Sequence, residues 1–215
     1  MVQRLLFFVL LSFALFSCAV TSKVSSAETY RADGFSPERI NERGMAILPI
    51  TAGADLEGYR RPFGDALNQS IDGLFEGVVG WNKTMEILNQ ADLVSEYQAA
   101  IQAYNETAIL DQSVMRKMTE ALDVQYLLYV RLSPPESTSQ ARYNALAGTA
   151  YTEQTQAVFA YAKIWDRGGD VVWEGSSEAK AVSGAYSYID ESISEQCNKT
   201  AKGLARRLRG LAVAE

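Results

Sequence analysis

A β-hairpin is predicted for residues 157–175, which read Ala157-Val158-Phe159-Ala160-Tyr161-Ala162-Lys163-Ile164-Trp165, then Asp166-Arg167-Gly168-Gly169-Asp170, then Val171-Val172-Trp173-Glu174-Gly175. In the first run, small and branched side chains alternate with the larger Phe159, Tyr161, Lys163 and Trp165, which is the two-residue period of a strand with two unlike faces. Gly168-Gly169 supplies the positive φ angles that a short turn needs. The preceding part of the chain is therefore expected to pack against this hairpin.

Alternating strands and helices are predicted for the rest of the chain. Apolar runs indicate strands at residues 44–50, 81–88 and 124–132, and apolar residues at three- and four-residue steps indicate helices at 59–78, 91–104, 111–122 and 189–208. Asp111 is the expected N-cap of its helix. Pro134-Pro135 is expected to end the strand before it, which leaves residues 133–153 as a long loop. This order predicts one α/β domain at residues 40–212.

The N-terminus has the pattern of a bacterial lipoprotein signal peptide. One basic residue precedes an apolar run that is long enough for a signal peptide but short for a membrane span, which needs about 20 residues. Leu15-Phe16-Ser17-Cys18 resembles the lipobox, in which the cysteine is lipidated and becomes the first mature residue. We expect residues 1–17 to be removed and Cys18 to carry the lipid. An ordinary signal peptide cut after Ala27 is the alternative.

The residues after Cys18 suggest where the protein is anchored. Ala19 stands where lipoproteins kept at the inner membrane carry Asp, so the motif resembles the pattern sorted to the outer membrane. The acyl chains of a lipidated cysteine, palmitate among them, are together enough for stable anchoring. Residues 18–39 begin with a polar segment that is typical of a flexible tether. We therefore expect an outer-membrane anchor with the domain facing the periplasm.

Composition argues against a nucleic acid partner. The chain has 20 Lys and Arg against 26 Asp and Glu, a net charge of −6, and loss of Arg4 with the signal peptide makes it about −7. Binding of phosphates needs a basic face instead. Lipidation would use Cys18, one of the two cysteines, and leave Cys197 unpaired on the apolar side of a helix. Cys197 is expected to be a buried small hydrophobe, and a redox or intermolecular role is the alternative.

Three landmarks in this order of elements carry a family resemblance: Met45-Ala46-Ile47-Leu48-Pro49-Ile50, Leu122-Asp123-Val124-Gln125-Tyr126-Leu127-Leu128, and Ile164-Trp165-Asp166 followed by Gly169-Asp170-Val171-Val172-Trp173-Glu174-Gly175. Over residues 40–210 the chain resembles the envelope lipoproteins related to the curli secretion protein, the lipoprotein activators of penicillin-binding proteins, and the amino-terminal domain of the Tol-system periplasmic protein. The resemblance implies an α/β sandwich, a mixed β-sheet with helices packed on its faces. The segment 134–154 lacks the regular alternation of a pore-forming strand, which disfavours a curli-type pore.

No catalytic motif is found in the sequence. The chain has no His, which removes the commonest general base and the zinc sites and triads that use it. Ser177-Glu178-Ala179-Lys180 has the Ser-x-x-Lys spacing of penicillin-recognising enzymes, but it follows a strand and the accompanying motifs are missing. Asp166 and Asp170 could hold a cation, although turn formation is the favoured explanation. We therefore assign no catalytic residue, cofactor or metal, and expect that the chain is not an enzyme.

Three hypotheses of function follow. The first is a non-enzymatic binding or accessory protein in envelope assembly, with regulation of a cell-wall synthase as one role and an envelope protein or a second copy as partner. The alternative is an oligomeric subunit of a curli-like secretion or assembly complex. The third is an enzyme that uses the carboxylates of Glu174 and Glu178. These residues are four positions apart on one strand and therefore about 13 Å from each other, which is farther than the two carboxylates of a glycosidase.

Aromatic residues are the candidate partner-binding surface. They are Phe159, Tyr161 and Trp165 of the predicted strand, with Tyr143 and Tyr151 of the predicted loop beside them. The alternative is that helices cover this face of the sheet and make the strand aromatics part of the core. Alanine substitution at Trp165 separates the two, because a core residue is needed for folding and an interface residue for partner binding.

Overall fold

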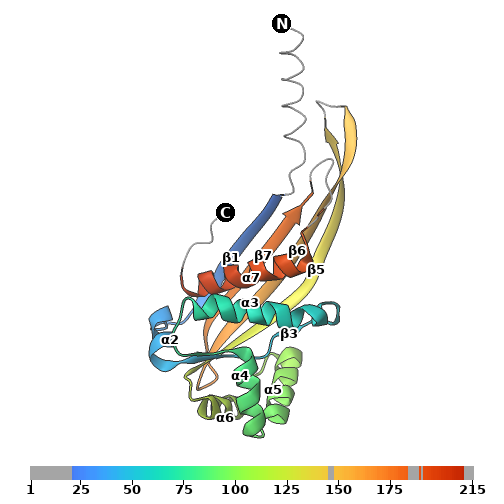
Figure 1. Cartoon of the computed structure of the whole chain (residues 1–215). Helices are drawn as coiled ribbons and strands as arrows, with labels where there is room; N and C mark the ends of the chain where they lie inside the picture. The colour runs from blue at the N-terminus through green and yellow to red at the C-terminus, as the bar shows by residue number, and fades with distance from the viewer. Residues whose placement is uncertain (1–20, 145–147, 184–188, 190, 211–215) are drawn as a thin grey trace.

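A seven-stranded mixed β-sheet organises the part of the chain that the structure describes (Figure 1). The structure is a computed structural model that describes residues 21–144, 148–183, 189 and 191–210. The predicted signal peptide and Cys18 lie outside the described residues. The strands are β1 (Thr21–Arg31), β2 (Met45–Ile47), β3 (Thr51–Ala52), β4 (Val78–Val79), β5 (Tyr126–Asn144), β6 (Thr149–Asp166) and β7 (Val171–Val182). Their order is β1-β7-β6-β5-β2-β4, with β3 also paired to β5.

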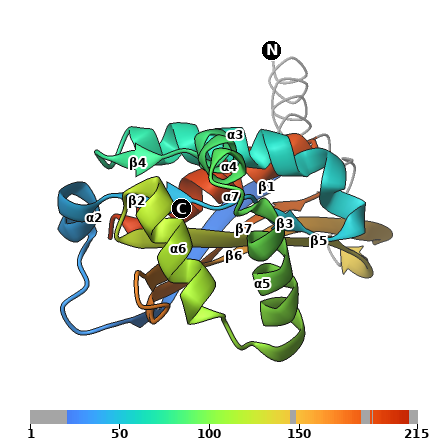
Figure 2. The same cartoon turned by 90° about the horizontal axis from the view of Figure 1, so that it is seen from below.

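Helices pack on both faces of this sheet, as predicted for an α/β sandwich. They are α2 (Pro37–Arg43), the short 3-10 helix η1 (Ala54–Tyr59), α3 (Arg60–Asp72), α4 (Trp81–Gln90), α5 (Val94–Thr107), α6 (Gln112–Leu122) and α7 (Ile193–Leu208). Helices α3 and α7 cover one face, and their apolar residues form one core with Val158, Ala160 and Ile164 of β6. Helices α4, α5 and α6 contribute to a second core at one end of the sheet (Figure 1), and α5 and α6 lie on the face away from α3 (Figure 2).

The predicted hairpin is confirmed as β6 and β7. Ile164 pairs with Trp173 across it. The Asp166 side chain accepts hydrogen bonds from the backbone N–H groups of Gly168 at 2.8 Å and Asp170 at 3.0 Å. Gly169 has a φ of 86°, which favours glycine. Asp166 is therefore a turn-forming aspartate.

The predicted loop at residues 133–153 is wrong, because β5 and β6 continue through it as one long antiparallel ribbon. Pairing extends to Asn144 opposite Thr149. Pro134 and Pro135 do not end β5, since the register shifts between Ser133 and Glu136. Pairing of β5 with β3 ends at Leu132. Beyond this residue the outer side of β5 needs no backbone N–H donors, so proline, which has none, is tolerated there.

The predicted flexible tether is also wrong over Thr21–Arg31, which forms the edge strand β1. It pairs with β7 from Thr21 opposite Val182 to Arg31 opposite Trp173. Strand β1 is polar because it is an edge strand. A hydrogen bond of 2.8 Å from the Trp173 indole N–H to the Glu28 carboxylate also joins it to β7.

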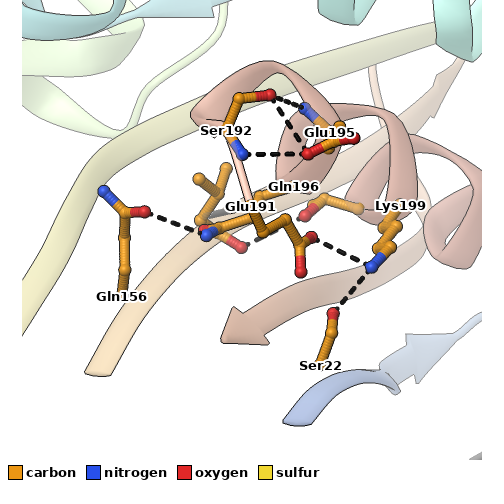
Figure 3. A network of polar contacts seen from close by, with 9 residues as sticks. Ser22, Gln156, Glu191, Ser192, Glu195, Gln196 and Lys199 are labelled. Carbon is orange, nitrogen blue, oxygen red and sulfur yellow. Dashed lines mark hydrogen bonds and ion pairs between the residues drawn. The ribbon is translucent and has the colours of Figure 1, made fainter. Parts of the chain in front are cut away.

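Other element boundaries differ for local reasons. The predicted strand at residues 81–88 is the helix α4, in which Trp81, Thr84 and Leu88 recur at helical spacing and the last two are buried. The predicted helix at 59–78 ends at Asp72, and the last helix begins later than residue 189. Its N-cap is Ser192, which forms a reciprocal capping box with Glu195 (Figure 3). Two further predictions are confirmed: Asp111 caps α6, and Cys197 is unpaired and buried.

Candidate functional site: the open face of the sheet

One face of the sheet is only partly covered. Phe159, Tyr161, Lys163 and Trp165 share this face of β6, as the two-residue period predicts, and α5 and α6 pack over the Trp165 end. At the other end no helix of the described chain covers this face of β6, and Phe159 is 38% exposed. We call the uncovered part the open face. It consists of Arg131, Phe159, Tyr161, Lys163, Glu174, Glu178 and Lys180, which the register places in neighbouring rows.

Trp165 belongs to the core and not to a surface, which corrects its assignment as a partner-binding candidate. Its side chain is 1% exposed. The ring centroid lies 5.1 Å from that of Tyr104 of α5 and 5.2 Å from that of Tyr129 of β5. The core alternative therefore holds for Trp165, because α5 docks directly over it. It does not hold for Phe159, which lies further along β6 and away from α5.

Lys163 lies at the border between this core and the open face. Its ammonium group is 2.8 Å from a carboxylate oxygen of Glu174, the residue opposite it on β7. It also lies over two aromatic rings, 5.7 Å from the centroid of Tyr104 and 5.6 Å from that of Tyr161. Burial opposes charge on Lys163, but the hydrogen bonds to Glu174 and Tyr104 outweigh it and raise the lysine pKa. Lys163 is therefore positively charged at neutral pH.

Phe159 and Tyr161 form the aromatic part of the open face. Burial and the hydrogen bond to Glu174 raise the pKa of Tyr161 to about 12, so its hydroxyl stays neutral. Arg131 lies opposite Tyr161, and Glu178 lies opposite Phe159. The exposed aromatic ring is therefore bordered by side chains of both charges, an arrangement that suits protein contacts.

Tyr143 and Tyr151, predicted to lie beside these aromatics, lie on a different part of the molecule. Eight residues of extended β6 separate Tyr151 from Phe159, about 26 Å at the usual rise. Both tyrosines belong to the outer part of the β5–β6 ribbon, where Tyr143 is 69% exposed. The structure thus brings together Phe159 and Tyr161, and places the two ribbon tyrosines elsewhere.

The candidate enzymatic groups do not converge. Ser177 is buried against α7 and its hydroxyl donates to the Ser25 carbonyl at 3.3 Å. Lys180 lies three positions after Ser177 on β7, so its side chain points to the face of the sheet opposite to that of Ser177. Glu174 is paired with Lys163, and Glu178 lies four positions away on the same face. Among the residues that the structure describes, no group of three or more His, Cys, Asp or Glu could hold a metal ion.

Sequence reasoning missed a cleft of about 400 Å³ between α5 and β3. Its polar walls bond to their own surroundings: the Tyr97 hydroxyl donates to the Pro49 carbonyl at 3.4 Å and the Arg60 guanidinium to the Ile50 carbonyl at 2.9 Å. It also missed the Lys163–Glu174 pair, which the hairpin register would have indicated. Because Tyr97 and Arg60 are engaged within the fold, the open face remains the candidate site.

No protein-family model matches the chain, and no curated protein matches its sequence. Several solved structures show a weak similarity to it. The PelC dodecamer from Paraburkholderia phytofirmans is 11% identical over 89% of this chain and 98% of that chain, with a TM-score of 0.44. A neuraminyllactose-binding hemagglutinin homolog from Helicobacter pylori is 11% identical over 84% and 88%, with a TM-score of 0.45. The LpoB C-terminal domain from Salmonella enterica is 13% identical over 68% and 86%, with a TM-score of 0.37.

These likenesses are too weak to assign a family or a function to this chain. The TM-scores of these three structures do not exceed 0.45, and their identities to this chain do not exceed 13%. The functions of these proteins therefore do not transfer to this chain, and the open face is interpreted from its own geometry.

Proposed function

We propose that this chain is a lipid-anchored, non-enzymatic accessory protein of the bacterial cell envelope that acts by binding another protein through the open face. The observation that carries the proposal is the exposed Phe159 beside Tyr161 on a part of the sheet that no described helix covers. Large apolar side chains that stay exposed beside ordered polar groups favour a protein contact.

The chemistry of the open face defines the partner it suits. A protein that places an apolar side chain on Phe159 would meet Arg131 on the β5 side and Glu178 and Lys180 on the β7 side. Such a partner needs charged groups of both signs around an apolar centre. The net charge of −6 makes nucleic acid a poor occupant, because phosphates would be repelled.

The lipobox supports the cellular location. Lipidation at Cys18 and the Ala19 that follows it favour the outer membrane, with the domain in the periplasm. Among the described residues, no helix is both long and apolar enough to cross a membrane. A cell-wall synthase or another envelope assembly protein is the partner class that this location favours.

Chemical crosslinking in intact cells, followed by mass spectrometry, tests the proposal. We expect the wild-type chain to be joined to an envelope protein, Phe159→Ser to lose most of that product, and Ile109→Ser to retain it. Ile109 is the matched control because it is 73% exposed and lies between α5 and α6. Equal yields from all three chains would contradict the proposal. Crosslinks only between copies of this chain would favour the oligomeric alternative.

A further inference from the structure

The β5–β6 ribbon extends past the end of its neighbouring strands (Figure 1). Val182, the last residue of β7, pairs with Thr21 of β1 on one side and with Thr155 of β6 on the other. Beyond this row, β6 continues to Thr149, where it pairs with Asn144 of β5. From Thr155 to Thr149, β6 advances by six residues of about 3.3 Å each, so the described ribbon extends about 20 Å beyond the row that contains Val182.

The start of β1 is held to the body of the domain at the same end (Figure 3). The Lys199 ammonium group of α7 donates to the Ser22 hydroxyl at 2.8 Å and pairs with the Glu191 carboxylate at 3.0 Å. Beside it, the Gln196 amide donates to Gln156 of β6 at 3.0 Å. The chain is therefore fixed to the sheet as far as Ser22, only four residues after Cys18.

The ribbon is longer than the link between the lipid and the sheet. Thr21 follows Cys18 by three residue steps, which span at most about 11 Å when fully extended. The ribbon reaches about 20 Å in the same direction from the same row. When the lipid on Cys18 is in the membrane, the outer end of the ribbon must meet that membrane unless the whole sheet tilts away.

We propose that the outer end of the β5–β6 ribbon lies in the membrane–water interface of the bilayer that holds the Cys18 lipid, with Tyr143 and Tyr151 as its interfacial side chains. The proposal rests on the lipid anchor of the proposed function. It adds a second point of contact, which fixes the orientation of the domain and therefore the direction of the open face.

The side chains of this end suit the headgroup region. Tyr143 pairs with Ala150 and Tyr151 with Arg142, so the two tyrosines belong to successive rows and point to opposite faces of the ribbon. Tyrosine has an apolar ring and a polar tip, which is why it is enriched at membrane interfaces. No charged residue occurs from Tyr143 to Thr152. The ion pair of Arg142 with Glu153, at 3.2 Å, begins the charged part.

The ribbon also lacks support of its own. None of the side chains that the structure describes in residues 136–143 and 150–154 is buried. An isolated two-stranded ribbon is marginally stable in water. Contact of its outer end with a membrane would stabilise the ribbon, whereas a ribbon surrounded only by water gains no stability from two tyrosines at that end.

Spin-label accessibility on the full lipidated chain tests the proposal. The chain is reconstituted in vesicles of phosphatidylethanolamine and phosphatidylglycerol with a nitroxide at Tyr143→Cys, or at Ile109→Cys as the control at the other end of the sheet. Cys197 stays unlabelled because it is buried, and burial raises its thiol pKa to about 11. We expect the ratio of collisions with oxygen to those with a water-soluble nickel chelate to be several-fold higher at position 143 than at position 109.

Equal ratios at the two positions in a chain that sediments with the vesicles would overturn the membrane contact and leave the anchor intact. Tyr151→Cys is the second position, in case the Tyr143 variant loses its native circular dichroism. A wild-type chain without lipid, shown by its mass and its failure to sediment, would overturn both the anchor and this contact. Binding of a partner through the open face would still be measurable, so the failures are distinguishable.

Discussion

Alanine at Trp165 and at Phe159 should have very different consequences, although both residues lie on the same face of β6. Trp165 is 1% exposed and packs on Tyr104 and Tyr129. Removal of such a side chain leaves a cavity and costs about 3–5 kcal/mol of unfolding free energy. Phe159 is 38% exposed, and because full burial of a Phe contributes about 1.5–3 kcal/mol, its partial burial predicts a cost of about 1–2 kcal/mol.

Urea unfolding of residues 18–215 with Cys18→Ser measures this difference without a lipid. The expected result is a midpoint for Trp165→Ala that lies below that of Phe159→Ala, with similar m-values, so that the two free energies of unfolding differ by about 1–4 kcal/mol. If the two variants lost the same stability, α5 would not cover Trp165 selectively. The division of this face into core and open face would then be wrong.

Three further substitutions test other parts of the structure. Asp111→Ala should cost about 1 kcal/mol in urea unfolding, because Asp111 accepts the Ser113 and Val114 N–H groups at the start of α6; an unchanged midpoint would contradict the cap. Gly203→Ala should cost about 1–3 kcal/mol, since its methyl group would lie 2.9 Å from Val24 of β1, whereas Gly58→Ala, with open space around it, should be nearly neutral. The pKa of Glu28 is lowered chiefly because the Arg31 side chain donates hydrogen bonds to its carboxylate. Burial acts in the opposite direction, and the hydrogen bond from Trp173 lowers the pKa further. The ionised Glu28 therefore stabilises the folded chain at pH values above its pKa in the unfolded chain, about 4.3. This stabilisation is lost as the pH falls through the lower pKa of Glu28 in the folded chain. Glu28→Gln should therefore reduce stability at pH 7 but flatten its decline in acid, and parallel curves for both chains would refute this.

The sequence predicted those parts of the fold in which local pattern and packing agree. The alternation from Val158 to Trp165 and the Gly168-Gly169 turn identified the central hairpin, and Asp111 identified a helix start. Strand β1 and the outer ribbon were missed because they are polar and little buried, so no apolar period marks them. Pro134-Pro135 indicated a strand end, but a register shift accommodates them.

The candidate site was predicted only in part. The period placed Phe159, Tyr161 and Trp165 on one face, but which of them is covered depends on where α5 docks. That docking is a long-range contact that a single-strand pattern does not contain. For the same reason, the separation of Tyr143 and Tyr151 from Phe159 became evident only when the loop proved to be a ribbon.

Site-specific photo-crosslinking in living cells tests the central claim most directly. A benzophenone amino acid at position 159 on the open face is compared with one at position 109, which is also exposed. We predict a product with one defined envelope protein from position 159 and none from position 109. The same products from both positions, or none from position 159 while the protein is folded and anchored, would contradict binding through the open face.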